Sequence, residues 1–266
     1  PTSYNVAAVV QPSVATDSQH EGDKEAGKEA TAEPTETVSR EATGTSGFRN
    51  SGEVTSRVVS NWNGFVSALN DNSIQNITIS GNVVATGDNG NTDNGRVNSV
   101  DRTVAINSQG RNVVIQGRND QASLDLLSNS LKFTGSSAWN LVFKNLQLAT
   151  GNSKGAVDLS STTGANTVTF ENVKSQGSSL YGGGGNTDVI VKGETSSTVS
   201  DSYRSANGQT QYVQRNVGSA GHSVLRREAN IHDAKSVTVA DGASLTLNRS
   251  SQGDGINLAG GSTVRV

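Results

Sequence analysis

The sequence predicts an all-β fold in which short parallel strands wind into a β-solenoid. One observation is a recurring phrase: a small polar residue, an apolar one, any residue, an apolar one and a polar one, often followed by Gly or Asn. A second is the alternation of apolar side chains within each copy, which has the period of a strand. A third is that no segment between copies is a helix long enough for a βαβ unit. The six copies begin at Asn76, Asn112, Asn140, Thr167, Asp188 and Ser236.

The spacing of the copies indicates how the chain winds. The steps are 36, 28, 27, 21 and 48 residues, and the last equals two turns if one copy is disguised. Strands at intervals of twenty-odd residues, joined by Gly, Asn and Ser turns, are typical of a parallel β-solenoid. Stacked inside it should be Val113/Ile115, Leu141/Phe143, Val168/Phe170, Val189/Val191 and Val237/Val239. A weakly basic outward column should hold Gln116, Lys144, Glu171, Lys192 and Ala240.

The composition fits a narrow interior. Only 32% of the 266 residues are hydrophobic, and 30 are Gly. Without Cys, the chain has no disulfide framework and no thiolate metal site. No apolar run reaches the length of a membrane span, and no signal peptide is visible. The absence of Met and the ending in mid-strand lead us to expect a piece of a longer protein, with further rungs after residue 266.

Two regions differ in composition. Residues 1–46 contain all three prolines and few large apolar side chains, so we expect a disordered, acidic, low-complexity linker. This linker has 8 acidic and 3 basic residues, a net charge of −5. Residues 47–266, the predicted solenoid domain, have 18 basic and 16 acidic residues, a net charge of +2.

One helix is expected, over residues 60–69. Its apolar side chains lie at i, i+3, i+4 and i+7, behind Ser60 as N-cap. Just before the first strand, such a helix would cover the open hydrophobic end of the coil. The Asp88–Gly95 loop looks like a calcium loop, but it lacks the bidentate Glu and the spacing of an EF-hand, which favours a solvated turn. We therefore predict neither a metal site nor a cofactor.

The repeat is interrupted between Thr195 and Asp233, where two of the four tyrosines and four arginines gather. Aromatic rings can stack on sugar faces, and guanidinium groups can clamp carboxylates or sulfates. This combination predicts a glycan-binding loop, with a basic track of lysines beside it and a tryptophan that is either a sugar platform or the cover of a turn. The candidate ligand-binding residues are Tyr203, Arg204, Tyr212, Arg215, Arg226, Arg227, Lys144, Lys174, Lys192 and Trp139.

The helix, the Ile-Thr-Ile-Ser-Gly-Asn-Val-Val strand and the Asn-Val-Val-Ile-Gln-Gly and Asn-Leu-Val-Phe-Lys-Asn rungs resemble the pectate-lyase-like adhesive domains of Gram-positive surface proteins. With the acidic lead-in, the sequence is most similar to the binding region of serine-rich-repeat adhesins of lactobacilli, over roughly residues 48–266. The resemblance implies a right-handed parallel β-helix on the cell wall that binds host or plant polysaccharides. It also implies that acidic glycans such as pectin or sulfated chains bind more strongly at acidic pH.

Other functions also fit parts of the sequence. A pectin lyase or hydrolase would need an acid and a base placed around one cleft; Asn186-Thr187-Asp188 and Gly221-His222 echo hydrolase signatures, but no Asp-Asp pair occurs. The first catalytic suspects would be Asp201, His222 and Arg204. A structural stalk is a further alternative, whereas a net charge of +2 argues against nucleic acid. We expect a monomeric, non-catalytic adhesin domain that binds polysaccharides or glycoprotein glycans of mucus or epithelium, without direct membrane contact.

A pH effect follows from the residues among the arginines. Carboxyl groups titrate near pH 4 and imidazoles near pH 6.5 in unfolded peptides. Acidification would therefore neutralise acidic neighbours and charge histidines, which would strengthen attraction for a polyanion that is still ionised. The residues concerned are Asp201, Glu228, Asp233, His222 and His232.

Overall fold

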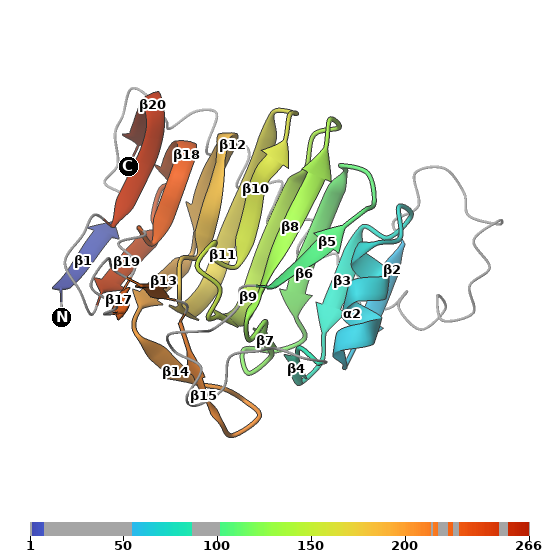
Figure 1. Ribbon diagram of the computed structural model, residues 1–266. Helices are drawn as coiled ribbons and strands as arrows, with labels where there is room; N and C mark the ends of the chain where they lie inside the picture. The colour runs from blue at the N-terminus through green and yellow to red at the C-terminus, as the bar shows by residue number, and fades with distance from the viewer. Residues whose placement is uncertain are drawn as a thin grey trace.

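Parallel strands wind into a solenoid in the computed structural model, so the predicted fold class is confirmed (Figure 1). The structure describes residues 2–7, 55–86, 102–213, 215–217, 223–225, 229–249 and 255–265. Each full turn of the coil has three straight segments, and segments of successive turns pair in register. The strands therefore form three ladders that run along the coil.

The first ladder contains the recurring phrase. Val113 pairs with Leu141, and Leu141 with Val168, as the predicted inward columns require. All ten predicted inward side chains are buried, and the rings of Phe143 and Phe170 stack with centroids 5.6 Å apart. The ladder comprises β2 (Ser56–Val59), β3 (Asn76–Ile79), β6 (Asn112–Gly117), the first parts of β9 (Asn140–Thr150) and β11 (Asn166–Gly177), and the last parts of β12 (Tyr181–Lys192), β18 (Ile231–Val239) and β20 (Ile256–Arg265).

The predicted alignment of the copies is wrong in two places. Asn76 pairs with Val114 instead of Asn112, a slip of two residues that keeps the same face inward because the side-chain period of a strand is two. Asp188 pairs directly with Ser236, so the 48-residue step is one turn with a long insertion and contains no disguised copy.

The second and third ladders complete each turn. The second consists of β4 (Asn82–Val84), β7 (Ser123–Asp125), the last parts of β9 and β11, β13 (Glu194–Val199) and β19 (Ser244–Arg249). The third consists of β5 (Arg102–Ile106), β8 (Asn129–Gly135), β10 (Val157–Thr162) and the first parts of β12, β18 and β20.

The corner between the first and second ladders carries the predicted outward column. Asn145 and Asn172 occupy it with left-handed φ values of 51° and 54°, and the Asn172 amide donates to Asn145 Oδ1. The side chains just before these asparagines, Lys144 and Glu171, lie against this corner. Lys144 is only 9% exposed, and its Nζ lies 3.8 Å from Glu171 Oε2. Ala240 is buried in the core. The column is therefore not the outward basic stripe that the sequence predicts.

The predicted end-capping helix is present as α2 (Trp62–Leu69). Its buried residues include Trp62, Phe65 and Leu69, and it packs on strands β2 to β5 at one end of the coil (Figure 1). Two details of the prediction are wrong. The N-cap is Asn61, whose side chain accepts from the Gly64 amide, and strand β2 precedes the helix.

Part of the predicted linker is structured. Thr2–Ala7 forms β1, which pairs antiparallel with β19 at the other end of the coil (Figure 1). An edge strand offers a row of unpaired backbone groups, and an extended segment satisfies them whatever its composition. Residues 8–54 and the Asp88–Gly95 loop lie outside the described residues.

Candidate functional site

The insertion between β13 and β18 supplies one wall of the candidate site. It is shorter than predicted, because 195–199 belongs to the second ladder and 231–233 to the third. It contains two antiparallel hairpins, β14 (Ser202–Arg204) with β15 (Thr210–Tyr212) and β16 (Arg215–Val217) with β17 (Ser223–Leu225). Figure 1 shows β14 and β15 projecting from the body of the coil.

Hairpin β14–β15 is anchored to the second ladder by Tyr203. The ring lies over Gly177, where a Cβ would come within 2.9 Å of Tyr203 Cδ1. The hydroxyl donates a hydrogen bond of 2.6 Å to Asp125 Oδ1. Burial, together with the negative charge of Asp125, raises the pKa of Tyr203 well above its usual value. At 5% exposure this ring cannot stack on a sugar, so its predicted role as a platform is wrong.

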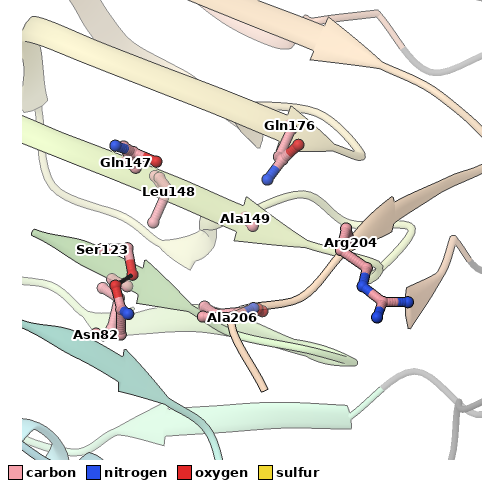
Figure 2. Close-up of a pocket in the computed structure, with 10 residues that line it drawn as sticks. Asn82, Ser123, Gln147, Leu148, Ala149, Gln176, Arg204 and Ala206 are labelled. Carbon is pink, nitrogen blue, oxygen red and sulfur yellow. Dashed lines mark hydrogen bonds between the residues drawn. The ribbon is translucent and has the colours of Figure 1, made fainter. Parts of the chain in front are cut away.

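A groove with a volume of about 150 Å³ lies between the hairpin and the outer face of the second ladder. Figure 2 shows Asn82 and Ser123 near one end and Arg204 at the other. Four neighbouring strands contribute to its floor, because their outward positions are stacked by the ladder register. The lining residues are Asn82, Ser123, Leu124, Asp125, Gln147, Leu148, Ala149, Gln176, Arg204 and Ala206.

The accessible polar groups of the groove are mostly neutral. Asn82, Gln147 and Gln176 are exposed and offer amide donors and acceptors, while Arg204 adds an exposed guanidinium group. The carboxylate of Asp125 is only 3% exposed and is occupied by donors from the hairpin. The groove can therefore hydrogen-bond hydroxyl groups and hold an anionic group at the Arg204 end.

The other aromatic and arginine candidates are only partly described. Tyr212 is half-buried in β15. Arg215 begins β16, but its side chain is not among those described, and Arg226 and Arg227 lie outside the described residues. Among the predicted binding residues, Arg204 is the one that the structure places in the groove.

The predicted lysine track is divided between two places. Lys144 and Lys192 lie at the corner between the first and second ladders, where Lys144 pairs with Glu171 and Lys192 is half-buried. Lys174 is exposed on the second ladder, in register with Gln147 of the groove. Only Lys174 therefore lies in a row that leads to the groove.

Trp139 is a core residue. Its side chain is fully buried, its ring meets Phe133 edge to face at 4.9 Å, and its Nε1 donates to the Thr134 carbonyl. The guanidinium group of Arg111 lies 5.5 Å from the ring centroid. Both faces are thus covered by protein, so the sugar-platform interpretation is wrong, because packing into the coil removes the ring from solvent.

The residues that echo hydrolase signatures serve the fold. Asp188 accepts a hydrogen bond from Ser236, and Thr187 is buried. Asp201 is half-buried, and its carbonyl accepts from the Val213 amide, while His222 lies outside the described residues. Across the described ranges, no three His, Cys, Asp or Glu side chains are placed to hold a metal ion. In the same ranges, no helix is long and apolar enough to cross a membrane.

Two buried tyrosines predict a loss of stability at alkaline pH. Burial raises the pKa of Tyr181 and of Tyr203 in the folded state. The unfolded chain would ionise them near pH 10, so the free energy of unfolding should fall above that pH by up to about 1.4 kcal/mol per pH unit per tyrosine. Urea unfolding at pH 7 to 11.5 measures this. Tyr181→Phe and Tyr203→Phe should each flatten the fall, and variant curves parallel to wild type above pH 10 would contradict the assignment.

The groove residues other than Arg204 were missed by sequence reasoning. Asn82, Ser123, Gln147 and Gln176 look like ordinary turn or strand polar residues, and only the register of the second ladder brings them together. The sequence signal that could have found them is the set of outward-facing positions in the strand that follows each repeated phrase. Combined with the position of the insertion, these positions mark the floor of the groove.

Comparison with known proteins agrees with this architecture. The family model described as "Putative pectate lyase-like adhesive domain" matches residues 56–181. A solved serine-rich repeat protein (SRRP) of Lactobacillus reuteri 100-23 is similar in structure, with a TM-score of 0.51 and 16% identity over 71% of this chain and 50% of that one. The SRRP of L. reuteri 53608 has a TM-score of 0.48 and 23% identity over 70% of this chain and 60% of that one.

This chain therefore spans only about half to three fifths of the length of those structures. No curated protein matches it. The fold seen here is the one that the 100-23 structure shares, and the resemblance to adhesive domains is confirmed by the family match. Residues 56–181 of this chain are thus similar to the family described as a putative pectate lyase-like adhesive domain.

Proposed function

We propose that this chain is a cell-surface adhesin domain that binds acidic polysaccharides, without catalysis, in the groove between the second ladder and hairpin β14–β15. The observation that carries the proposal is the combination of exposed amides with one guanidinium group along a single groove. The family match supports the adhesive role, since it describes an adhesive domain. Polygalacturonate, sulfated glycans and the acidic glycans of mucus or epithelium are the intended ligand class.

The charges around the groove support a preference for acidic glycans. Arg204 can form two parallel hydrogen bonds with a uronate or sulfate group. Lys174 lies in the row next to Gln147 and can add a second positive charge. The single carboxylate of the floor, Asp125, is covered by the hairpin and does not face the ligand. The neutral amides are suited to the hydroxyl groups of any sugar.

The affinity of one domain should be low. Exposed ion pairs contribute up to about 1 kcal/mol each, so a few of them with hydrogen bonds correspond to millimolar to micromolar dissociation constants. Many monomeric copies displayed on the wall of a Gram-positive cell would bind a polymer much more tightly than one copy does. This mode of binding serves adhesion rather than capture of a free small molecule.

Stronger binding at acidic pH is a further part of the proposal. Its support is the position of the half-buried Asp201, which stands at the start of the hairpin, three residues before Arg204 in the sequence. His232 and Asp233 belong to β18 of the third ladder and do not line the groove. Glu228 and His222 lie outside the described residues.

Replacing Arg204 tests the site. Arg204→Ala should weaken binding to polygalacturonate about fivefold, since one charge-assisted contact at an exposed position is lost. Arg118→Ala is the matched control, because Arg118 is also exposed but does not line the groove. Isothermal titration at pH 5 and pH 7, with an absorbance assay for unsaturated product on the same samples, gives both binding and catalysis.

Three results would contradict the proposal. Equal losses in the two arginine variants would mean that net charge, not the groove, attracts the polymer. Unsaturated product would favour the alternative of a lyase acting on pectin. Absence of binding at either pH would favour the alternative of a structural stalk.

A further inference from the structure

We propose that Asp125 is the positioning residue that fastens hairpin β14–β15 to the second ladder and so places Arg204 at the groove. The link to ligand binding rests on the proposed function, whereas the fastening itself does not. Asp125 ends strand β7, far from the hairpin in sequence, and its side chain does not need to touch the ligand.

The carboxylate of Asp125 accepts hydrogen bonds from both sides. From the hairpin, the hydroxyl of Tyr203 donates to Oδ1 and that of Ser205 to Oδ2, each at 2.6 Å, and the Ala206 amide donates to Oδ2 at 3.3 Å. From its own strand end, the Leu127 amide donates to Oδ1 at 3.0 Å. Asp125 is thus a fully used acceptor at 3% exposure.

These contacts determine where Arg204 lies. The hairpin leaves the coil after β13 and returns past β11 and β9 to reach β7, three strand spacings or about 14 Å away. Arg204 stands between Tyr203 and Ser205, and both of these neighbours are bonded to Asp125. The backbone of Arg204 is therefore held from both sides, while its own side chain stays exposed.

Only a carboxylate satisfies this arrangement. Each oxygen of Asp125 faces one backbone N–H, from Leu127 or from Ala206. An asparagine would turn its NH2 group toward one of them, whichever way it is oriented. Hydroxyl groups can rotate to accept a hydrogen bond, but a backbone N–H cannot. Because the Leu127 bond is the shorter, the asparagine oxygen should stay there and the Ala206 contact should be lost.

Amide hydrogen exchange on Asp125→Asn tests the fastening without a ligand. The Ala206 amide should exchange about 10- to 100-fold faster than in wild type. The Ser205 amide, bonded to the Gln209 carbonyl inside the hairpin, and the Val168 amide, in the first ladder, should keep their protection. Unchanged exchange at Ala206 would overturn the proposal. Equal acceleration at Val168 would also overturn it, because Asp125 would then support the whole coil.

A second variant guards against an indirect effect of the asparagine. Tyr203→Phe combined with Ser205→Ala removes both hairpin hydroxyls and leaves Asp125 with its Leu127 bond. It should accelerate exchange at Ala206 as Asp125→Asn does. If the Ala206 amide stays protected in this variant, the hydroxyls do not fasten the hairpin and the proposal fails.

Binding to polygalacturonate separates positioning from the proposed function. Asp125→Asn should weaken binding by the same factor as Arg204→Ala. The variant that combines Asp125→Asn with Arg204→Ala should bind no more weakly than Arg204→Ala alone, because both changes remove the same contact with the polymer. Full binding by Asp125→Asn beside a loss in Arg204→Ala would overturn the positioning role and leave the proposed function standing. Full binding by Arg204→Ala would overturn the proposed site, and exchange at Ala206 would still decide the fastening.

Discussion

Replacing Trp139 by alanine should lower the free energy of unfolding by about 3–5 kcal/mol, the usual cost of truncating a fully buried tryptophan. Three interactions of the side chain are lost: the packing against Phe133, the hydrogen bond from Nε1 to the Thr134 carbonyl, and the contact of the ring with the guanidinium group of Arg111. Urea unfolding followed by far-ultraviolet circular dichroism measures it. Trp139 therefore stabilises the coil and is not accessible at the surface.

Val142→Ala is the matched control for that experiment. Val142 lies in β9, the strand that begins directly after Trp139, but its side chain faces outward and is only half-buried. Its truncation should cost less than about 1 kcal/mol. If Trp139→Ala left the unfolding midpoint unchanged and weakened glycan binding, the sugar-platform interpretation would have to be restored.

Replacing Gly182 by alanine should cost about 3 kcal/mol or more, because a Cβ at this position would overlap the carbonyl oxygen of Lys154. Lys154 lies in the turn of the preceding rung, directly against β12. The added carbon must push two rungs apart, and this breaks ladder hydrogen bonds as well as packing. The unfolding midpoint in urea and exchange of the Tyr181 amide report the two effects.

Gly208→Ala distinguishes steric overlap from backbone strain. Gly208 has a φ of +91° at the turn of hairpin β14–β15, with no other atom within 4 Å of an added Cβ. Alanine there costs about 1–2 kcal/mol of local strain, confined to the hairpin. If Gly182→Ala proved no more harmful than Gly208→Ala, the rungs would have to be free to separate at Lys154, and the tight stacking seen there would not contribute to stability.

The insertion has two different roles: it attaches to the buried Asp125 of β7, and it holds the exposed Arg204. Within the hairpin, Tyr203 attaches the strand pair to the coil, whereas the guanidinium group of Arg204 lies at the groove. A loop that carries both tyrosines and arginines therefore need not present both at a surface, because a tyrosine such as Tyr203 can be buried in attaching the loop.

The sequence by itself determined the solenoid. Alternating β-branched and aromatic residues have a period of two, and register between rungs follows because a slip of one residue would turn Leu141 or Phe170 outward. The end helix was equally readable, since its apolar positions form one helical face. These features depend on side chains a few residues apart, and local patterns record them.

Only the tertiary structure decided the site. The contact between Tyr203 and Asp125 joins residues 78 positions apart, and no periodic pattern specifies where an insertion folds back. Trp139 and Lys144 are buried by neighbouring rungs, and no local pattern records that burial. The side-chain amides of Asn82 and Gln147 line one groove because the second ladder stacks them beneath the hairpin. This proximity results from the winding of the chain and cannot be recognised from neighbouring positions in the sequence.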